Sequence, residues 1–268
     1  MNKKQTRIIL IVLILYFAIF GYIFGWHNFQ KFISKSYIVL DDGTKFMLKN
    51  GKWITNTEEN SKLYNWQKFD IYTDNKYFGK YNVYYNKKLY LFDNEKKSVS
   101  YDSSDIMGYR GTAKIDVIDF KTEYSFDNEG ITALNTYIKS KKLELTTNDF
   151  DQKMITLDYD NNGKNDKMYV AVSLYTGKKD VGYFVYLISD SGKIELLDFK
   201  TGDNSSQYNF CWPSIEKIID VFKDKRYELI VGCSYYSNKG DCDMMYEKSF
   251  GKYKKVVDCK DVDTEAKK

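Results

Sequence analysis

An uncharged apolar run over residues 8–26, IILIVLILYFAIFGYIFGW, constrains this chain more than any other feature. At ~1.5 Å of rise per residue, a helix over this run is long enough to cross the ~30 Å hydrocarbon core of a bilayer. A helix of a water-soluble domain carries a polar face, whereas this run is apolar all round. The run therefore predicts a transmembrane anchor at residues 8–26, preceded by a cytoplasmic N-terminus at residues 1–7.

The residues that flank this run favour one orientation. Lys3, Lys4 and Arg7 precede it, and basic residues collect on the cytoplasmic side of a membrane. Lys31 and Lys35 follow it closely, so the charge asymmetry is modest. The alternative, a cleaved secretory signal, needs a shorter apolar core and small residues at the cleavage site. The residues at the C-terminal end of this run are bulky instead. Both alternatives export the rest of the chain, so we expect a single-pass protein of the cell membrane whose bulk is extracytoplasmic.

Short β-favouring runs separated by turn signals fill most of the remaining chain. Residues 36–53, SYIVLDDGTKFMLKNGKW, hold two such runs. An Asp-Gly signal separates them and an Asn-Gly signal follows the second, and both signals are typical of hairpins. Residues 80–92 and 113–120 predict further strands, and the pattern resumes from residue 153 onward. We therefore expect a mainly β ectodomain.

One segment carries a helical pattern instead. Asp127 is placed to cap an amphipathic helix through EGITALNTYIKSKK, with Ile131, Leu134 and Ile138 at helical spacing. This helix would separate two β-rich units. The expected organisation beyond the anchor is a juxtamembrane linker at 27–35, an N-terminal β-rich unit at 36–145, a C-terminal repeat-like β unit at 146–259 and a disordered tail at 260–268.

Charge and histidine content exclude some functions. The 41 basic and 37 acidic residues are spread along the chain, without the clustered Lys/Arg face that nucleic-acid binding requires, so we expect no nucleic-acid partner. The only histidine, His27, lies at the predicted membrane edge, which argues against histidine-based catalysis. Hydrolysis by paired carboxylates leaves no linear signature. We assign no catalytic residue, and enzymatic activity stays an open question.

The segment DYDNNGKND, from Asp158 to Asp166, is the strongest candidate for a chemical site. Asp158, Asp160 and Asn162 offer side-chain oxygens, Lys164 would lend its carbonyl, and Asp166 would close the loop. Oxygen ligands at positions one, three, five and nine are suited to Ca²⁺, which accepts an irregular all-oxygen cage. The alternative is a polar hairpin turn, because Asp, Asn and Gly favour turns for backbone reasons alone.

This loop differs from an EF-hand, which carries a glutamate at position twelve and helices on both sides, because position twelve is Tyr169 and the flanks are strand-like. Asp158 to Asp166, followed by the run MYVAVS, resembles the calcium loops of FG-GAP (integrin α-like) and VCBS-type β-propeller repeats. The resemblance covers the C-terminal half only. It implies propeller-blade-like antiparallel repeats and one structural calcium ion.

A second copy of the loop follows 62 residues later. Asp220, Asp224 and Glu228 align with Asp158, Asn162 and Asp166 of the first copy. Both copies lead into an apolar run. Phe222 replaces the second ligand and Lys225 replaces the turn glycine. We expect the second copy to keep the turn without the metal ion.

The four cysteines lie near the C-terminus, and in an exported domain such a set indicates disulfides. Cys233 and Cys242 flank one turn closely, so we expect them to pair across a hairpin and Cys211 to pair with Cys259. Three pairings are open to four cysteines, and four reduced thiols are the alternative.

We conclude from the sequence that the chain is a membrane-anchored, calcium-stabilised binding or adhesion module, with a protein or glycan ligand at the cell envelope. The alternatives are a cell-envelope hydrolase that uses acidic residues and an accessory subunit of a membrane complex.

Overall fold

The computed structural model describes most of the chain after the predicted anchor. The described residues are 9, 12–13, 25–26, 28–41, 44–55, 65–86, 88–101, 103, 105–124, 127–145, 150–173, 180–203, 211–235, 242–249 and 251–259.

The fold is mainly β, as the sequence predicts, and the described strands form three antiparallel sheets. The first sheet has the spatial order β3-β2-β1-β8-β4-β5-β6-β7. Its strands are β1 (Ser36–Leu40), β2 (Lys45–Lys49), β3 (Lys52–Thr55), β4 (Gln67–Thr73), β5 (Lys76–Asn86), β6 (Lys88–Phe92), β7 (Ser98–Val99) and β8 (Ile106–Gly111).

The second and third sheets each contain five of the described strands, in matching spatial order. The second sheet runs β10 (Thr122–Tyr124), β11 (Asp151–Leu157), β12 (Asp166–Ser173), β13 (Asp180–Ile188) and β14 (Ile194–Asp203). The third runs β9 (Asp116–Val117), β15 (Cys211–Asp220), β16 (Glu228–Tyr235), β17 (Cys242–Ser249) and β18 (Lys252–Val257). Strands β12 and β16 begin and end 62 residues apart, which is the period that the two loops predict.

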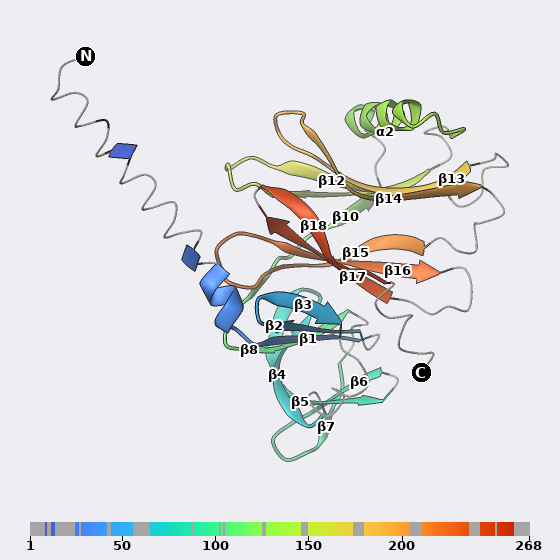
Figure 1. Cartoon of the computed structure of the whole chain (residues 1–268). Coiled ribbons are helices and arrows are strands. Elements are labelled where there is room, and N and C mark those ends of the chain that lie inside the picture. The colour runs from blue at the N-terminus through green and yellow to red at the C-terminus, as the bar shows by residue number, and fades with distance from the viewer. Residues whose placement is uncertain are drawn as a thin grey trace.

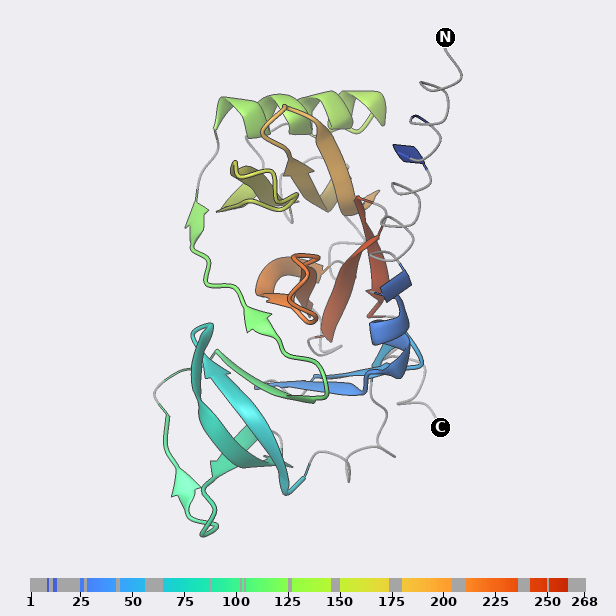
Figure 2. The same cartoon turned by 90° about the vertical axis from the view of Figure 1, so that its left-hand side faces the viewer.

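The sheets are stacked in layers, with the third sheet between the second and the first (Figures 1 and 2). Successive side chains on one strand point to opposite faces of the sheet, so a strand of the second or third sheet contributes side chains to two cores. Met168 and Val170 lie in the core between the second and third sheets, whereas Tyr169 lies in the core beneath the helix. Leu229 and Ile230 divide in the same way between the two faces of the third sheet. Burial on both faces explains why these strands read as continuous apolar runs.

Helix α2 (Asn128–Ser140) covers the outer face of the second sheet (Figure 1). Asp127 caps it, as predicted, by accepting a hydrogen bond from the Gly130 backbone N–H at 2.8 Å. The buried face of the helix, including Leu134 and Ile138, packs on that sheet. Tyr169 of β12 donates its hydroxyl to Asp127 at 2.9 Å and so fixes the start of the helix against the sheet.

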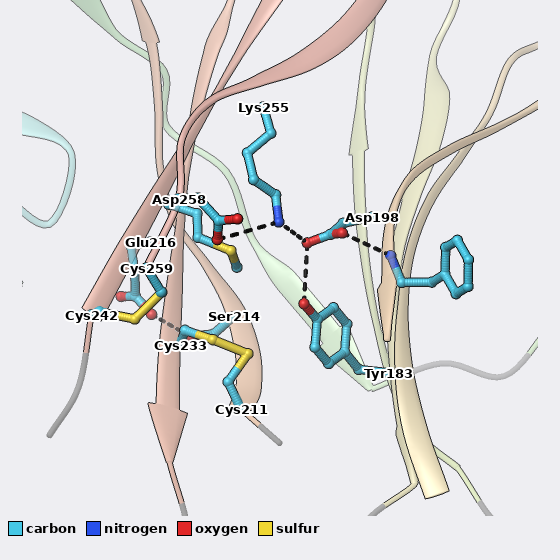
Figure 3. The surroundings of a disulfide bond; sticks show 12 residues. Tyr183, Asp198, Cys211, Ser214, Glu216, Cys233, Cys242, Lys255, Asp258 and Cys259 are labelled. Carbon is cyan, nitrogen blue, oxygen red and sulfur yellow. Dashed lines mark hydrogen bonds and ion pairs between the residues drawn. A yellow bond between two sulfur atoms is a disulfide. The ribbon is translucent and has the colours of Figure 1, made fainter. Parts of the chain in front are cut away.

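Buried polar groups join the layers. The Asp198 carboxylate on β14 accepts a hydrogen bond from the Tyr246 hydroxyl at 2.6 Å and lies 2.7 Å from the Lys255 ammonium, both on the third sheet; Figure 3 shows Lys255 and Asp198 facing each other. Between the third and first sheets, the buried Lys217 ammonium pairs with Asp105. A buried ammonium needs such a partner, so this pair fixes how the two sheets meet.

The sheets divide the chain at a different place from the boundary expected near residue 145. The first sheet ends at Gly111, and β9 and β10 already belong to the third and second sheets. Residues 28–33, expected as linker, are helical. The predicted anchor at 8–26 and the tail at 260–268 lie largely or wholly outside the described residues. Among the residues that are described, no helix has the length and apolar character to cross a bilayer.

Candidate metal centre

The loop between β11 and β12 brings together the three carboxylates that the sequence predicts as ligands. Asp158, Asp160 and Asp166 each place a carboxylate oxygen within 4.8 Å of the others. Ca²⁺ binds oxygen at ~2.3–2.6 Å, so oxygens up to ~5 Å apart can share one ion. The donor set is all oxygen, which a hard cation requires. The residues present therefore fit a calcium ion.

Backbone hydrogen bonds hold this loop in shape. The Asn162 N–H donates to Asp158 Oδ1 at 3.0 Å and to Asp160 Oδ1 at 3.1 Å. The Gly163 N–H donates to Asp158 Oδ2 at 2.9 Å. Gly163 has a φ of +86°, in the left-handed region that glycine adopts at little cost. The turn thus aims two carboxylates toward the middle of the loop.

Asp166 closes the loop from the first position of β12. It is 1% exposed, and its two oxygens accept from the backbone N–H groups of Tyr159 and Asp190, each at 2.9 Å. Asp166 is the most buried member of the cluster, and backbone N–H groups hold both of its oxygens. It also ties the loop to the β13–β14 turn, where Asp190 lies.

Asn162 and Lys164 lie in the same loop, and Asp190 joins them from outside it. Asn162 Nδ2 donates to Asp160 at 3.1 Å and to Asp190 at 2.9 Å, while the Lys164 N–H donates to Asn162 Oδ1 at 2.8 Å. The Lys164 ammonium pairs with Asp190 at 3.0 Å, and this hydrogen bond is the main cause that lowers the pKa of Asp190. The sequence analysis did not identify Asp190, because it comes from the β13–β14 turn and not from the loop itself.

A lysine that the sequence analysis missed lies beside the cluster. The Lys248 ammonium on β17 donates to the backbone carbonyl of Tyr159. Burial lowers the pKa of Lys248, while the charges of Asp160 and Asp166 oppose that shift. A half-buried cation in this position offsets part of the negative charge of the loop and would repel an incoming metal ion. No local pattern could have identified it, because β17 is far away in the sequence.

The loop between β15 and β16 repeats the same hydrogen-bond pattern. Each bond corresponds to one in the first loop with both residues moved by 62 positions. The bonds are Asp224 N–H to Asp220 Oδ1 at 3.0 Å, Lys225 N–H to Asp220 Oδ2 at 2.8 Å, Arg226 N–H to Asp224 Oδ1 at 3.1 Å and Val221 N–H to Glu228 Oε2 at 3.3 Å. The left-handed glycine is replaced by Lys225, which has a φ of +63°. The second loop therefore keeps the turn, as the spacing predicts.

The second loop lacks part of the ligand set. Phe222 occupies the position equivalent to Asp160, and Glu228 occupies that of Asp166. Glu228 is 1% exposed, and its burial, followed by the nearby charge of Glu247, raises its pKa well above the usual value. A raised pKa makes the carboxylate form of Glu228 less favourable, so Glu228 is a poorer ligand for a cation than an ordinary carboxylate.

The cysteine pairing that the sequence predicts is wrong, although all four cysteines form disulfides. The bonds join Cys211 to Cys233 and Cys242 to Cys259, with Cα–Cα distances of 5.0 and 5.7 Å, and the two lie next to each other in Figure 3. Cys233 and Cys242 do face each other across β16 and β17. However, the sulfurs of Cys233, Cys242 and Cys259 lie within 4.8 Å of one another, so closeness to a turn could not single out one pair.

A second cluster of acidic residues lines a small cavity between the first and third sheets. Asp41, Asp105, Glu216 and Asp243 line it together with Lys217, and its volume is about 170 Å³. Sites for small molecules usually measure ~300–1,000 Å³. The cavity is therefore small for the glycan substrate that an acid-dependent envelope hydrolase would need.

Comparisons of the chain with protein-family models, with curated proteins and with solved structures find no match. The resemblance to FG-GAP and VCBS-type repeats accordingly depends on the loop and on the matching order of the two five-stranded sheets.

Proposed function

We propose that the chain is an extracytoplasmic binding or accessory module, held at the membrane by residues 8–26 and stabilised by one Ca²⁺ ion at the first loop. The observation that carries the calcium site is the convergence of Asp158, Asp160 and Asp166 within 4.8 Å. The second loop forms the same turn with Phe222 in place of Asp160. The turn therefore forms without a carboxylate at this position, which supports a further role for Asp160 as a metal ligand.

We propose further that the two five-stranded sheets are blade-like repeats related to the FG-GAP and VCBS type. Two features support this: the same order of strands in both sheets, and a loop of the same hydrogen-bond pattern at the same strand connection. The repeats would form an abbreviated arrangement in which two sheets stack face to face, rather than a closed ring around a channel.

The proposed location is supported by two features. Two disulfides favour an oxidising compartment outside the cytoplasm. The helical residues 28–33, directly after the proposed anchor, expose the large apolar side chains of Phe29, Phe32 and Ile33. Such side chains are stable where a helix leaves the bilayer.

The proposed ligand-binding face lies on the first sheet, far from the metal loop. Trp66 is exposed there, and its ring lies 5.4 Å from the Tyr84 ring and 5.0 Å from the Phe92 ring. Exposed aromatic rings contribute large contact areas to protein and glycan ligands. We expect Trp66→Ala to abolish retention of the chain on purified cell-wall glycan or on its protein partner, with Tyr124→Ala, an exposed tyrosine elsewhere, as the control.

Calorimetric titration of the full chain in nonionic detergent with CaCl₂ tests the metal site. The variant Asp158→Asn, Asp160→Asn keeps acceptors for the backbone N–H groups and removes two charges. The control Glu95→Gln, Glu123→Gln removes two exposed charges elsewhere. We expect saturable binding of one ion to the wild type and the control, and none to the loop variant. Equal binding by all three chains, or binding by none, would contradict the site.

Extraction and protease accessibility test the location. We expect the chain to stay in membranes after carbonate extraction and to be cleaved by protease added outside intact spheroplasts. Release by carbonate, or protection from the external protease, would contradict the proposed topology.

A further inference from the structure

A cavity of about 370 Å³ lies between the N-terminal helical segment, the β2–β3 turn and the pair β17–β18. Its volume is within the ~300–1,000 Å³ typical of small-molecule sites. Its walls come from parts of the chain that are far apart in sequence, so the cavity exists only in the folded protein.

The cavity wall is strongly basic. Six of its twelve lining residues are cationic and one, Glu247, is anionic. The cationic residues are Lys31, Lys52, Arg226, Lys248, Lys254 and Lys255.

Ion pairs offset only part of this charge. Lys31 pairs with Glu247 and Lys255 with Asp198, while Arg226 Nε lies 3.8 Å from Asp224. Within the part of the chain that the structure describes, Lys52 and Lys254 have no carboxylate partner. The cavity therefore keeps an excess of positive charge. Its cationic residues come from segments that are far apart in the sequence.

A buried donor without an acceptor also lies in the cavity wall. Trp53 lines the cavity and is 3% exposed, and its indole Nε1–H has no hydrogen-bond partner among the described residues. An indole N–H can only donate, and a buried donor without an acceptor costs free energy. Trp53 therefore places an indole ring in the wall of the basic cavity, where its N–H resonance reports on what the cavity holds.

We propose that this cavity binds a phosphate-type anion. Several ammonium groups and a guanidinium from separate elements are suited to a group with several charged oxygens more than to a planar carboxylate. The phosphate could belong to a lipid headgroup, because the cavity adjoins the segment that follows the proposed anchor, or to a soluble phosphate compound. The inference goes beyond the proposed function and does not require calcium.

The test uses the full chain with ¹⁵N-labelled tryptophan in nonionic detergent, which contains no phosphate. The Trp53 indole N–H resonance is assigned with Trp53→Phe and followed during addition of inorganic pyrophosphate, and separately of phosphatidylglycerol or phosphatidylcholine. The variant Lys52→Gln, Lys254→Gln neutralises two exposed lining lysines. The matched control, Lys76→Gln, Lys193→Gln, neutralises two exposed lysines outside the cavity.

We expect a saturable shift of the Trp53 resonance, with affinity roughly 2- to 30-fold weaker in the lining variant, the range that two exposed charge contacts supply. A shift with pyrophosphate identifies a soluble phosphate as a ligand, and a shift with phosphatidylglycerol alone identifies a lipid headgroup. No shift with pyrophosphate or with either lipid, or equal weakening in the control variant, would overturn the proposal.

Discussion

Asn161 of the first loop donates its side-chain amide to the backbone carbonyl of Lys225 in the second loop, at a distance of 2.7 Å. The two loops therefore lie side by side although 64 residues separate these positions. Because the first loop contacts the second, an ion bound to the first would stabilise the junction of the two sheets as well as one turn.

Replacing Lys248 by methionine should tighten calcium binding. For a separation on the order of 6 Å, a unit charge and a divalent ion repel by roughly 1.4–5.5 kcal/mol at an effective dielectric constant of ~20–80, which corresponds to about 10-fold or more in affinity. Lys76→Met, an exposed lysine on the first sheet, is the matched control. Calorimetry measures the change, and unchanged or weaker binding by Lys248→Met would show that its charge does not oppose the ion.

Replacing Glu228 by glutamine should stabilise the protein at high pH. The pKa of Glu228 is raised in the folded chain by burial, then by Glu247, with Asp220 and Asp224 adding to the effect and the Val221 N–H opposing it. A carboxyl with a raised folded pKa contributes stability below its unfolded pKa of ~4.3, and this contribution is lost as the pH rises through the folded value.

We therefore expect the melting temperature of Glu228→Gln to exceed that of the wild type at pH 8 by about 2–4 °C for each ~1 kcal/mol gained. The difference should shrink as the pH falls toward the unfolded pKa of ~4.3, because the raised folded pKa lets the native side chain take up its proton before the unfolded chain does. The exposed Glu123→Gln serves as the control. A difference that grows as the pH falls would contradict the assignment.

Peptide mapping without reduction should recover Cys211 joined to Cys233 and Cys242 joined to Cys259. In Cys211→Ala, the freed Cys233 thiol lies within 4.8 Å of both sulfurs of the second disulfide, so thiol–disulfide exchange should yield mixed pairings. Losing one bond should cost about 2–4 kcal/mol of unfolding free energy. A single unchanged Cys242–Cys259 species in this variant would show that exchange does not occur.

Local patterns predicted the elements of the fold better than their assembly. Asp127 and the spacing of Leu134 and Ile138 identified helix α2 because capping and amphipathicity are local properties. The division of the chain near Gly111 could not be predicted, because β9 and β10 are very short and pair with distant strands. Tertiary pairing, rather than propensity, determines where such strands belong.

The sequence likewise predicted only the part of the candidate site that lies in one loop. Asp158, Asp160, Asn162, Lys164 and Asp166 follow a fixed spacing, so one loop sufficed to find them. Asp190 and Lys248 come from other strands and became visible only when the sheets were assembled.

The melting temperature of the full chain during titration with CaCl₂, beside the Asp158→Asn, Asp160→Asn variant, tests the central claim most directly. A ligand that binds only the folded state at 100 times its dissociation constant adds ~2.7 kcal/mol of stability. We predict a calcium-dependent rise of several degrees in the wild type and none in the variant, with MgCl₂ giving a smaller effect. An unchanged melting temperature of the wild type at millimolar calcium, or an equal rise in both chains, would contradict the account.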